Sequence, residues 1–125
     1  MGKKEGIRMN ILEIKELRKT YGTGETKVQA LNGINLTVER GEFVAVVGSS
    51  GSGKTTFLNM VGGLDVPTDG EIIVDQKKIQ ELSDDALTVF RRRKIGFIFQ
   101  QYNLIQMLSV WENIILPLKL DGRKV

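Results

Sequence analysis

The order of apolar and polar residues predicts an antiparallel sheet at the front of this chain. Residues 11–17 alternate between apolar and polar side chains, and residues 30–38 alternate again until the Arg-Gly pair at 40–41. Alternation with a period of two is typical of strands that have one buried and one solvated face, and such strands commonly pair antiparallel. We expect a turn at residues 21–24 between the two strands.

Two later segments have continuous apolar character instead. Residues 43–47 and residues 95–99 are apolar runs that adjoin or contain glycine. Such runs are typical of strands buried on both faces of an α/β sheet. A further strand is expected at residues 71–74, because the turn signal Pro-Thr-Asp-Gly at 67–70 precedes it.

Three helices are expected in the rest of the chain. The first covers residues 54–61 and ends at two consecutive glycines. The second follows Ser83, a favourable N-cap residue, and it begins with two aspartates and ends with the basic run 91–94, which suits the helix dipole. The third covers residues 110–116 and is expected to stop before Pro117.

Composition narrows the class of protein. The 125 residues have the length of one modest domain, and their hydrophobic (41%) and charged (26%) fractions are ordinary for a soluble globular protein. Residues 1–8 are polar and are expected to form a disordered extension, with Met9 as an alternative start. No apolar run approaches the ~18 residues that span a bilayer, so a membrane role would need a partner. Cysteine and histidine are absent, which excludes disulfides, favours an intracellular protein and removes the commonest general base.

Glycine is the one residue type in clear excess. The chain has 14 glycines, where average usage would give about nine, and five of them lie between residues 48 and 63. There, Gly-Ser-Ser-Gly-Ser-Gly-Lys-Thr at 48–55 matches the P-loop pattern G-x-x-x-x-G-K-[ST], with a predicted strand before it and a predicted helix after it. The net charge of +3 suits a site for anions but is too small to indicate DNA.

Phosphate binding explains why each residue type occurs at its position in the P-loop. Glycines let the backbone turn tightly and approach phosphates without an intervening Cβ atom. Successive N–H groups then form a nest for anions, helped by the positive end of the following helix. Lys54 is expected to reach the β- and γ-phosphates, and the Thr55 hydroxyl to bind Mg²⁺. GTPases, kinases, helicases and transport ATPases share this loop, so the loop alone leaves the reaction open.

Further segments at characteristic distances from the P-loop narrow the choice among these classes of P-loop protein. Tyr21 stands 27 residues before Gly48, Gly-Phe-Ile-Phe-Gln-Gln-Tyr-Asn-Leu covers residues 96–104, and Trp-Glu-Asn-Ile follows at 111–114. Together these resemble the ATP-binding subunit of an ABC transporter, and within that family the branch that powers lipoprotein release and macrolide or peptide export. The resemblance covers residues 9–120. It implies an α/β fold, a P-loop NTPase core (incomplete here) with an N-terminal antiparallel β subdomain.

The resemblance implies a set of site residues. Tyr21 is similar to the A-loop aromatic that stacks on adenine. Gln100, directly after the strand and preferred to its neighbour Gln101, is similar to the Q-loop glutamine that reaches Mg²⁺ and senses the membrane partner. ATP contacts are implied for Tyr21, Gly48, Ser49, Ser50, Gly51, Ser52, Gly53, Lys54, Thr55 and Thr56, and Mg²⁺ contacts for Thr55 and Gln100.

Two other features favour an ordinary structural interpretation. Residues 72–75 imitate a strand that ends in a metal-binding Asp, but Gln76 stands where such a site needs Glu. The resemblance places this segment in an antiparallel hairpin, so we assign Asp75 no catalytic role. The basic run 91–94 closes a helix, where it balances the dipole and faces water. We expect no contact with nucleic acid.

The sequence departs from the family pattern in what it lacks. A Leu-Ser-Gly-Gly-Gln signature, a true Walker B Asp, the catalytic Glu and the switch His are all absent. Residues 9–125 are therefore expected to form a partial nucleotide-binding domain, ending just after the Q-loop, that binds MgATP without hydrolysing it alone. Residues 43–47 would then expose apolar side chains and unpaired backbone. This pattern suggests a truncated gene or a partial reading of a longer protein.

Two kinds of function fit these observations. The first is the ATP-binding subunit of an exporter, on the cytoplasmic face of the membrane through a membrane subunit, which pairs head to tail with a second ATP-binding subunit in the full-length form. The alternative is a stand-alone nucleotide-binding or regulatory module that never hydrolyses, or the product of a decayed gene. A GTPase is disfavoured because no Asn-Lys-x-Asp motif is present.

Overall fold

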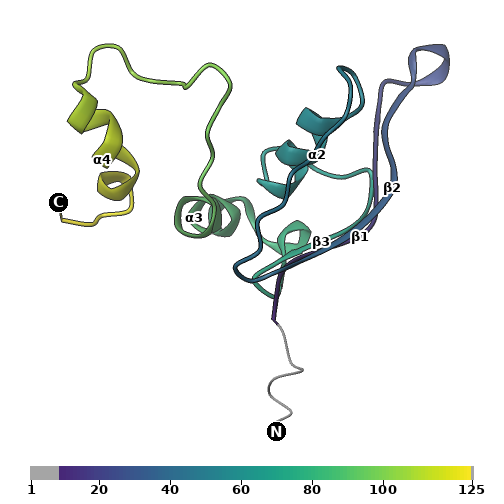
Figure 1. Ribbon diagram of the computed structural model, residues 1–125, viewed down its shortest axis with the longest axis horizontal. Helices are drawn as coiled ribbons and strands as arrows, with labels where there is room; N and C mark the ends of the chain where they lie inside the picture. The colour runs from purple at the N-terminus through teal and green to yellow at the C-terminus, as the bar shows by residue number, and fades with distance from the viewer. Residues whose placement is uncertain (1–8, 125) are drawn as a thin grey trace, which may run out of the picture. The chain divides into compact units, whose positions relative to one another are not determined.

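The computed structural model describes residues 9–124, so the prediction of disorder at residues 1–8 lies outside the described residues. The chain divides into two compact units at Leu82/Ser83. The first unit contains the sheet and the P-loop (Figure 1), and the second contains two helices.

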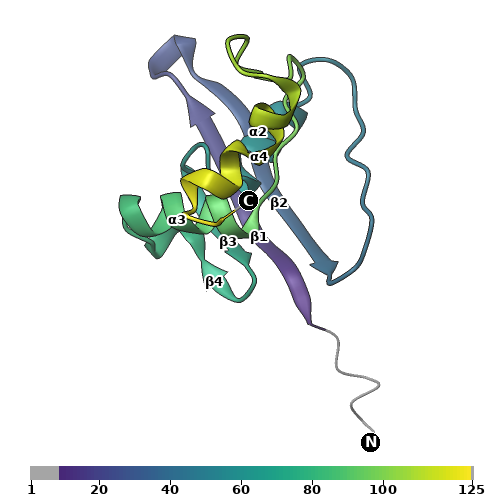
Figure 2. The same cartoon turned by 90° about the vertical axis from the view of Figure 1, so that its left-hand side faces the viewer.

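The first unit is built on a four-stranded antiparallel sheet with strand order β2-β1-β3-β4 (Figure 2). This confirms the antiparallel sheet expected at the front of the chain. Short 3₁₀ turns follow β1 and β4. The elements are β1 (Asn10–Tyr21), η1 (Gly24–Thr26), β2 (Val28–Glu39), α2 (Lys54–Val61), β3 (Asp69–Val74), β4 (Lys77–Lys78) and η2 (Ile79–Glu81).

A bulge in β1 sets which of its side chains are buried. The pairing of β1 with β3 changes from Lys15↔Glu71 to Arg18↔Asp69, so β1 carries one extra residue. Strict alternation after Ile14 would bury Glu16. The bulge, with Glu16 at φ +46°, turns Leu17 inward instead, and Leu17 is fully buried. An extra residue of this kind is how a strand changes the phase of its alternation.

The bulge is closed by side chains and by a glycine. The backbone N–H of Glu16 donates to Asn35 Oδ1 at 3.0 Å, and the Asn35 amide donates back to the Glu16 carboxylate. Opposite, Gly70 adopts φ +95° against the backbone of residues 16 and 17, where a Cβ atom would meet Glu16 O and would lie 2.7 Å from Leu17 Cα. The bulge therefore depends on a residue without a side chain at position 70.

Helix α2 covers one face of this sheet and completes the core of the first unit. Its bounds, Lys54–Val61, are those predicted, and Gly62 caps its end. Phe57 and Met60 are buried and face the interior, while Leu58 is 47% exposed. The buried apolar residues of the unit are Ile14, Leu17, Leu31, Val38, Phe57, Met60, Ile72, Val74 and Ile79.

Two predicted strands are not formed. Residues 43–47 and 95–99 pair with no strand within residues 9–124, and the segment between β2 and α2 runs as a long loop (Figure 2). Phe43 is 96% exposed and Ile98 is 92% exposed. A strand needs a neighbour for its backbone hydrogen bonds, and an apolar run without neighbouring strands cannot be buried on two faces. The prediction of buried strands was therefore wrong for this chain, whereas the expectation that residues 43–47 would expose apolar side chains and unpaired backbone is confirmed.

The second unit contains α3 (Asp84–Lys94) and α4 (Val110–Leu120). As predicted, Ser83 caps α3, with its side chain accepting from the Ala86 N–H at 3.2 Å. Ser109 forms a capping box with Glu112 at the start of α4. The prediction that this helix stops before Pro117 was wrong, because the helix continues through the proline to Leu120 and accepts the loss of one N–H donor there.

Asp121 connects the ends of these two helices electrostatically. Its carboxylate, 7% exposed, accepts from Arg92 Nε at 2.8 Å, Arg93 Nε at 2.9 Å and Arg123 Nε at 3.0 Å. The hydrogen bond from Arg93, followed by those from Arg92 and Arg123, lowers the pKa of Asp121 to about 2. The carboxylate is therefore more stable in the folded unit than in the unfolded chain.

Acidification should weaken the second unit through this group. Because the folded pKa lies below the unfolded value of about 3.9, the stabilisation is complete above that value and is lost as the pH falls toward 2. Thermal melts followed by circular dichroism should show Asp121→Asn less stable than the parent chain at neutral pH, with the difference shrinking between pH values of about 4 and 2. A difference that stays constant over this range would contradict the assignment.

Candidate functional site

The P-loop lies between β2 and the first turn of α2. Gly51 and Gly53 have φ values of +81° and +95°, a conformation that residues with side chains rarely adopt. A Cβ atom on Gly53 would lie 2.7 Å from Ala30 O and 3.2 Å from Leu31 Cδ2. The loop therefore packs directly on β2, and glycine permits both its turn and this close approach.

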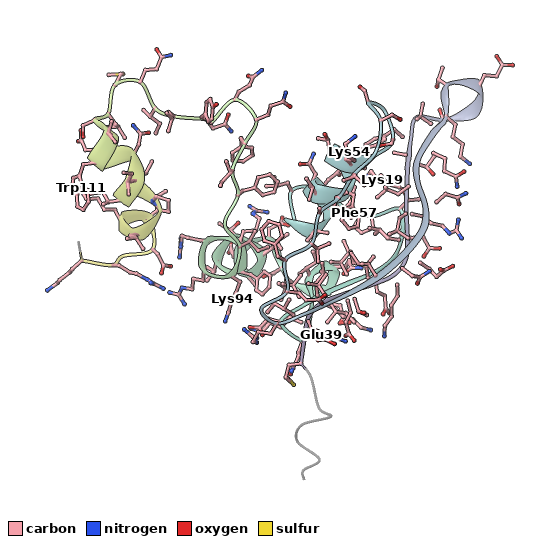
Figure 3. All side chains as sticks on the ribbon, in the orientation of Figure 1. Lys19, Glu39, Lys54, Phe57, Lys94 and Trp111 are labelled. Atoms are coloured by element: carbon pink, nitrogen blue, oxygen red, sulfur yellow. The ribbon has the colours of Figure 1, made fainter. Side chains whose placement is uncertain are left out.

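Lys54, the first residue of α2, folds back across the loop (Figure 3). Its Nζ atom donates to the carbonyl oxygen of Gly48, to that of Ser49 at 2.8 Å and to Ser52 Oγ at 3.4 Å. The loop is closed by a turn in which the Ser52 N–H donates to Ser49 O at 3.1 Å. The ammonium group is thus held over a ring of backbone atoms, where it faces any anion that enters the loop.

The start of α2 supplies further donors. Within residues 9–124, the backbone N–H groups of Lys54, Thr55 and Thr56 have no hydrogen-bond acceptor, as expected for the first turn of a helix. A hollow of about 510 Å³ opens beside them. It is lined by Val28, Gln29, Ala30, Ser50, Gly51, Gly53, Lys54, Thr55 and Thr56.

These features fit a nucleoside triphosphate with its magnesium ion. Donor groups, a lysine and glycines without side chains surround the hollow, and this is the environment that phosphates require. Thr55 offers a hydroxyl for Mg²⁺, which commonly takes few protein ligands and keeps phosphate and water oxygens. No cluster of three or more acidic, His or Cys side chains suited to a metal occurs in the part of the chain that the structure describes.

Tyr21 lies at the end of β1 and is held by two residues that the sequence analysis did not single out. Its hydroxyl donates to Asp65 Oδ2 at 2.7 Å, and Lys19 Nζ lies 4.9 Å from the centre of its ring. The ring is 40% exposed. Lys19 and Tyr21 share a face of β1 because they are two residues apart, and this spacing is the signal that could have suggested the pair.

Two further residues from the sequence analysis, Asp75 and Gln100, lie away from the P-loop in the sequence. Asp75 occupies the tight turn between β3 and β4, where its carboxylate pairs with Arg40 Nη2 at 2.8 Å. This confirms the hairpin expected there. Gln100 belongs to the second unit and is exposed in the turn after residues 95–99, so its role as a Mg²⁺ ligand remains a prediction.

A glycine-rich loop between a sheet and the start of a helix, with a lysine folded over it, defines a P-loop nucleotide-binding domain. Comparisons with known proteins identify the family. A sequence model of the ABC transporter family matches residues 31–124. The chain therefore belongs to the ABC transporter family, as the resemblance predicted.

The similar proteins include an archaeal cassette and bacterial exporters. The chain is 51% identical over 108 residues to the uncharacterized ABC transporter ATP-binding protein MJ0796 of Methanocaldococcus jannaschii, covering 86% of this chain and 46% of that protein. It is 48% identical over 108 residues to the macrolide export ATP-binding/permease protein MacB of Bdellovibrio bacteriovorus, covering 86% of this chain and 17% of that protein.

The fold is also that of solved cassettes. A dimeric structure of the MJ0796 cassette in a post-hydrolysis state with ADP and Pi matches with a TM-score of 0.84 at 49% identity, covering 91% of this chain and 49% of that one. The incomplete P-loop NTPase core with an antiparallel β subdomain is thereby confirmed. The chain spans about half the length of MJ0796 and a smaller share of MacB.

Proposed function

We propose that this chain is the nucleotide-binding part of an ABC transporter ATP-binding subunit and that it holds MgATP at residues 48–56. The observation that carries the proposal is the Lys54 ammonium, fixed over the P-loop by Gly48 and Ser49. On binding, the β- and γ-phosphate oxygens would replace these carbonyl groups as its acceptors. The N–H groups at the start of α2 would share the remaining negative charge, with support from the helix dipole.

Other residues would contact the magnesium ion and the base of the bound nucleotide. Thr55 would direct its hydroxyl to Mg²⁺, which shields the phosphate charge when bound. Tyr21 would stack on adenine, a contact of about 1–3 kcal/mol by analogy with bases on aromatic side chains. Gln100 would contribute its side-chain carbonyl to Mg²⁺. Residues 9–125 would serve as a partial nucleotide-binding domain.

The same proposal assigns binding without turnover to the 125-residue chain. Hydrolysis requires a group that accepts a proton from the attacking water, and the sequence has no histidine and no Walker B Asp followed by Glu. The full cassette would close on a second subunit head to tail. A solved structure of the MJ0796 cassette is dimeric, which supports the pairing of two such subunits.

The subunit would use the free energy of MgATP binding to change the conformation of a membrane partner. MacB is named an export ATP-binding/permease protein, which supports a role in export or release. None of the helices within residues 9–124 combines the length and apolar character needed to span a bilayer. Around α4, Met107 is 95% exposed and Val110 is 78% exposed, and exposed apolar side chains of this kind favour contact with another protein. The subunit would act on the cytoplasmic face of the membrane.

Titration of the purified chain with a ribose-labelled fluorescent ATP tests this function. Binding should saturate, depend on Mg²⁺ and be displaced by ATP and by inorganic tripolyphosphate, because the phosphates provide most of the contacts. Phosphate release should stay at the level of the buffer. Absence of saturable binding would refute the proposal, and steady ATP turnover that disappears in Lys54→Ala would refute binding without hydrolysis.

A further inference from the structure

The carboxylate of Asp65 lies at the centre of a small network beside the P-loop helix. Its Oδ2 atom accepts from the Tyr21 hydroxyl at 2.7 Å, and its Oδ1 atom accepts from Lys19 Nζ at 3.3 Å and from the Val66 N–H at 2.7 Å. Asp65 follows α2 by a few residues, whereas Lys19 and Tyr21 lie on β1. The network therefore connects a strand to the segment after the helix.

Lys19 is fixed within this network. Its side chain is only 14% exposed, and its Nζ atom also donates to Val66 O at 2.7 Å. The same ammonium lies 4.9 Å from the centre of the Tyr21 ring, within the range of a cation–π contact. In Figure 3 the Lys19 side chain extends from the sheet toward α2.

The two contacts restrain Tyr21 in complementary ways. The hydrogen bond to Asp65 fixes the hydroxyl end of the ring, and the Lys19 ammonium takes one face of the ring. A planar group would then have the opposite face of this ring, in a residue that is 40% exposed, on which to stack. The hydrogen bond from the Tyr21 hydroxyl to Asp65 raises the pKa of Tyr21 and lowers the pKa of Asp65, as expected when a phenol donates to a carboxylate.

We propose that Lys19 and Asp65 are positioning residues for the base of the bound nucleotide, because they hold the Tyr21 ring in the orientation that accepts a purine. This inference rests on the proposed function, in which Tyr21 stacks on adenine. An aromatic side chain that is already fixed loses less conformational entropy when a ligand binds. Removing the network should therefore weaken the contact with the base and leave the contact with the phosphates unchanged.

Replacing Asp65 by alanine tests the inference when two ligands are compared. Asp65→Ala should weaken binding of the fluorescent ATP by about 3- to 10-fold, the loss expected when one side chain must be ordered on binding. Binding of inorganic tripolyphosphate, which has no base, should stay at the value of the parent chain. Asp65→Asn keeps an oxygen that accepts from Tyr21 and should restore part of the affinity for ATP.

A matched control and a double variant complete the experiment. Glu71→Gln removes an exposed ion pair with Lys78 (3.2 Å) in the same unit and should leave both ligands unaffected. Tyr21→Phe removes only the hydroxyl, so the double variant Tyr21→Phe/Asp65→Ala should bind ATP no more weakly than Asp65→Ala alone. In the free chain, the ultraviolet absorbance of tyrosinate should show the pKa of Tyr21 moving down in Asp65→Ala.

The outcomes separate this inference from the proposed function. If the parent chain binds ATP through Lys54 but Asp65→Ala binds ATP equally well, the positioning role is wrong and the proposed function stands. If Asp65→Ala loses affinity for ATP and tripolyphosphate to the same extent, the network supports the fold and the inference is again overturned. If the parent chain binds neither ligand, the proposed function itself fails.

Discussion

Replacing Lys54 by alanine should weaken the binding of MgATP by about 100-fold or more. The ammonium lies over the loop within hydrogen-bond distance of Ser49 O and close to Gly48 O, so it is placed to meet two phosphate groups. A hydrogen bond to a charged group contributes about 1.5–3 kcal/mol. Loss of two such bonds corresponds to about two or more orders of magnitude in affinity. Titration with fluorescent ATP measures the change directly.

Lys78→Ala is the matched control for this substitution. Lys78 is an exposed lysine of β4 in the same unit, and it pairs with Glu71 rather than with the P-loop. The control removes the same charge and should bind ATP as the parent chain does. If Lys54→Ala and Lys78→Ala have equal affinities, the loss is a general effect of charge and the P-loop does not hold the phosphates.

Replacing Gly70 by alanine should destabilise the first unit by about 2–5 kcal/mol. The added Cβ atom would meet Glu16 O and would lie 2.7 Å from Leu17 Cα, and both are backbone atoms that cannot rotate away. The φ value of +95° adds a cost of about 1–2 kcal/mol for a residue with a side chain. Relief of the clash, typically about 1–3 kcal/mol for overpacking, would require the bulge to shift. Urea denaturation followed by circular dichroism measures the loss.

Gly41→Ala separates the two contributions. Gly41 also has a positive φ, +86°, but within residues 9–124 no atom beyond its chain neighbours lies within 4 Å of the position that its Cβ would take. This variant should lose only about 1–2 kcal/mol, the cost of the backbone conformation. Equal losses in both variants would mean that residues 16 and 17 move aside freely and that the bulge does not require glycine at position 70.

The sequence predicted the fold well where local pattern decides the structure. The bounds of α2 follow from the P-loop lysine at one end and Gly62 at the other, and Ser83 marks the start of α3. Alternation located β1 and β2, but not the bulge at Glu16. That bulge arises because Leu17 gains more from burial than Glu16 would, and because Asn35 and Gly70 accept the extra residue from neighbouring strands.

The errors at residues 43–47 and 95–99 have a common physical cause. Whether residues 43–47 form a buried strand depends on strands at both sides, which the local apolar pattern does not report. The expectation that this run would be exposed came instead from the resemblance to the family. Likewise, the P-loop was found from a contiguous motif, whereas the pairing of Lys19 with Asp65 joins residues 46 positions apart. The spacing of Lys19 and Tyr21 along β1 could have indicated a shared face, but only the folded chain brings Asp65 to it.

Helix α2 has a mechanical consequence for the candidate site. Its first turn carries Lys54 and Thr55, and the chain leaving its last turn carries Asp65, which holds the ring proposed to stack on the base. Thr56, in this first turn, also hydrogen-bonds the Tyr21 side chain. A movement of the turn when it binds an anion would therefore reach the aromatic ring directly, so the phosphate and base ends of a ligand would be sensed together.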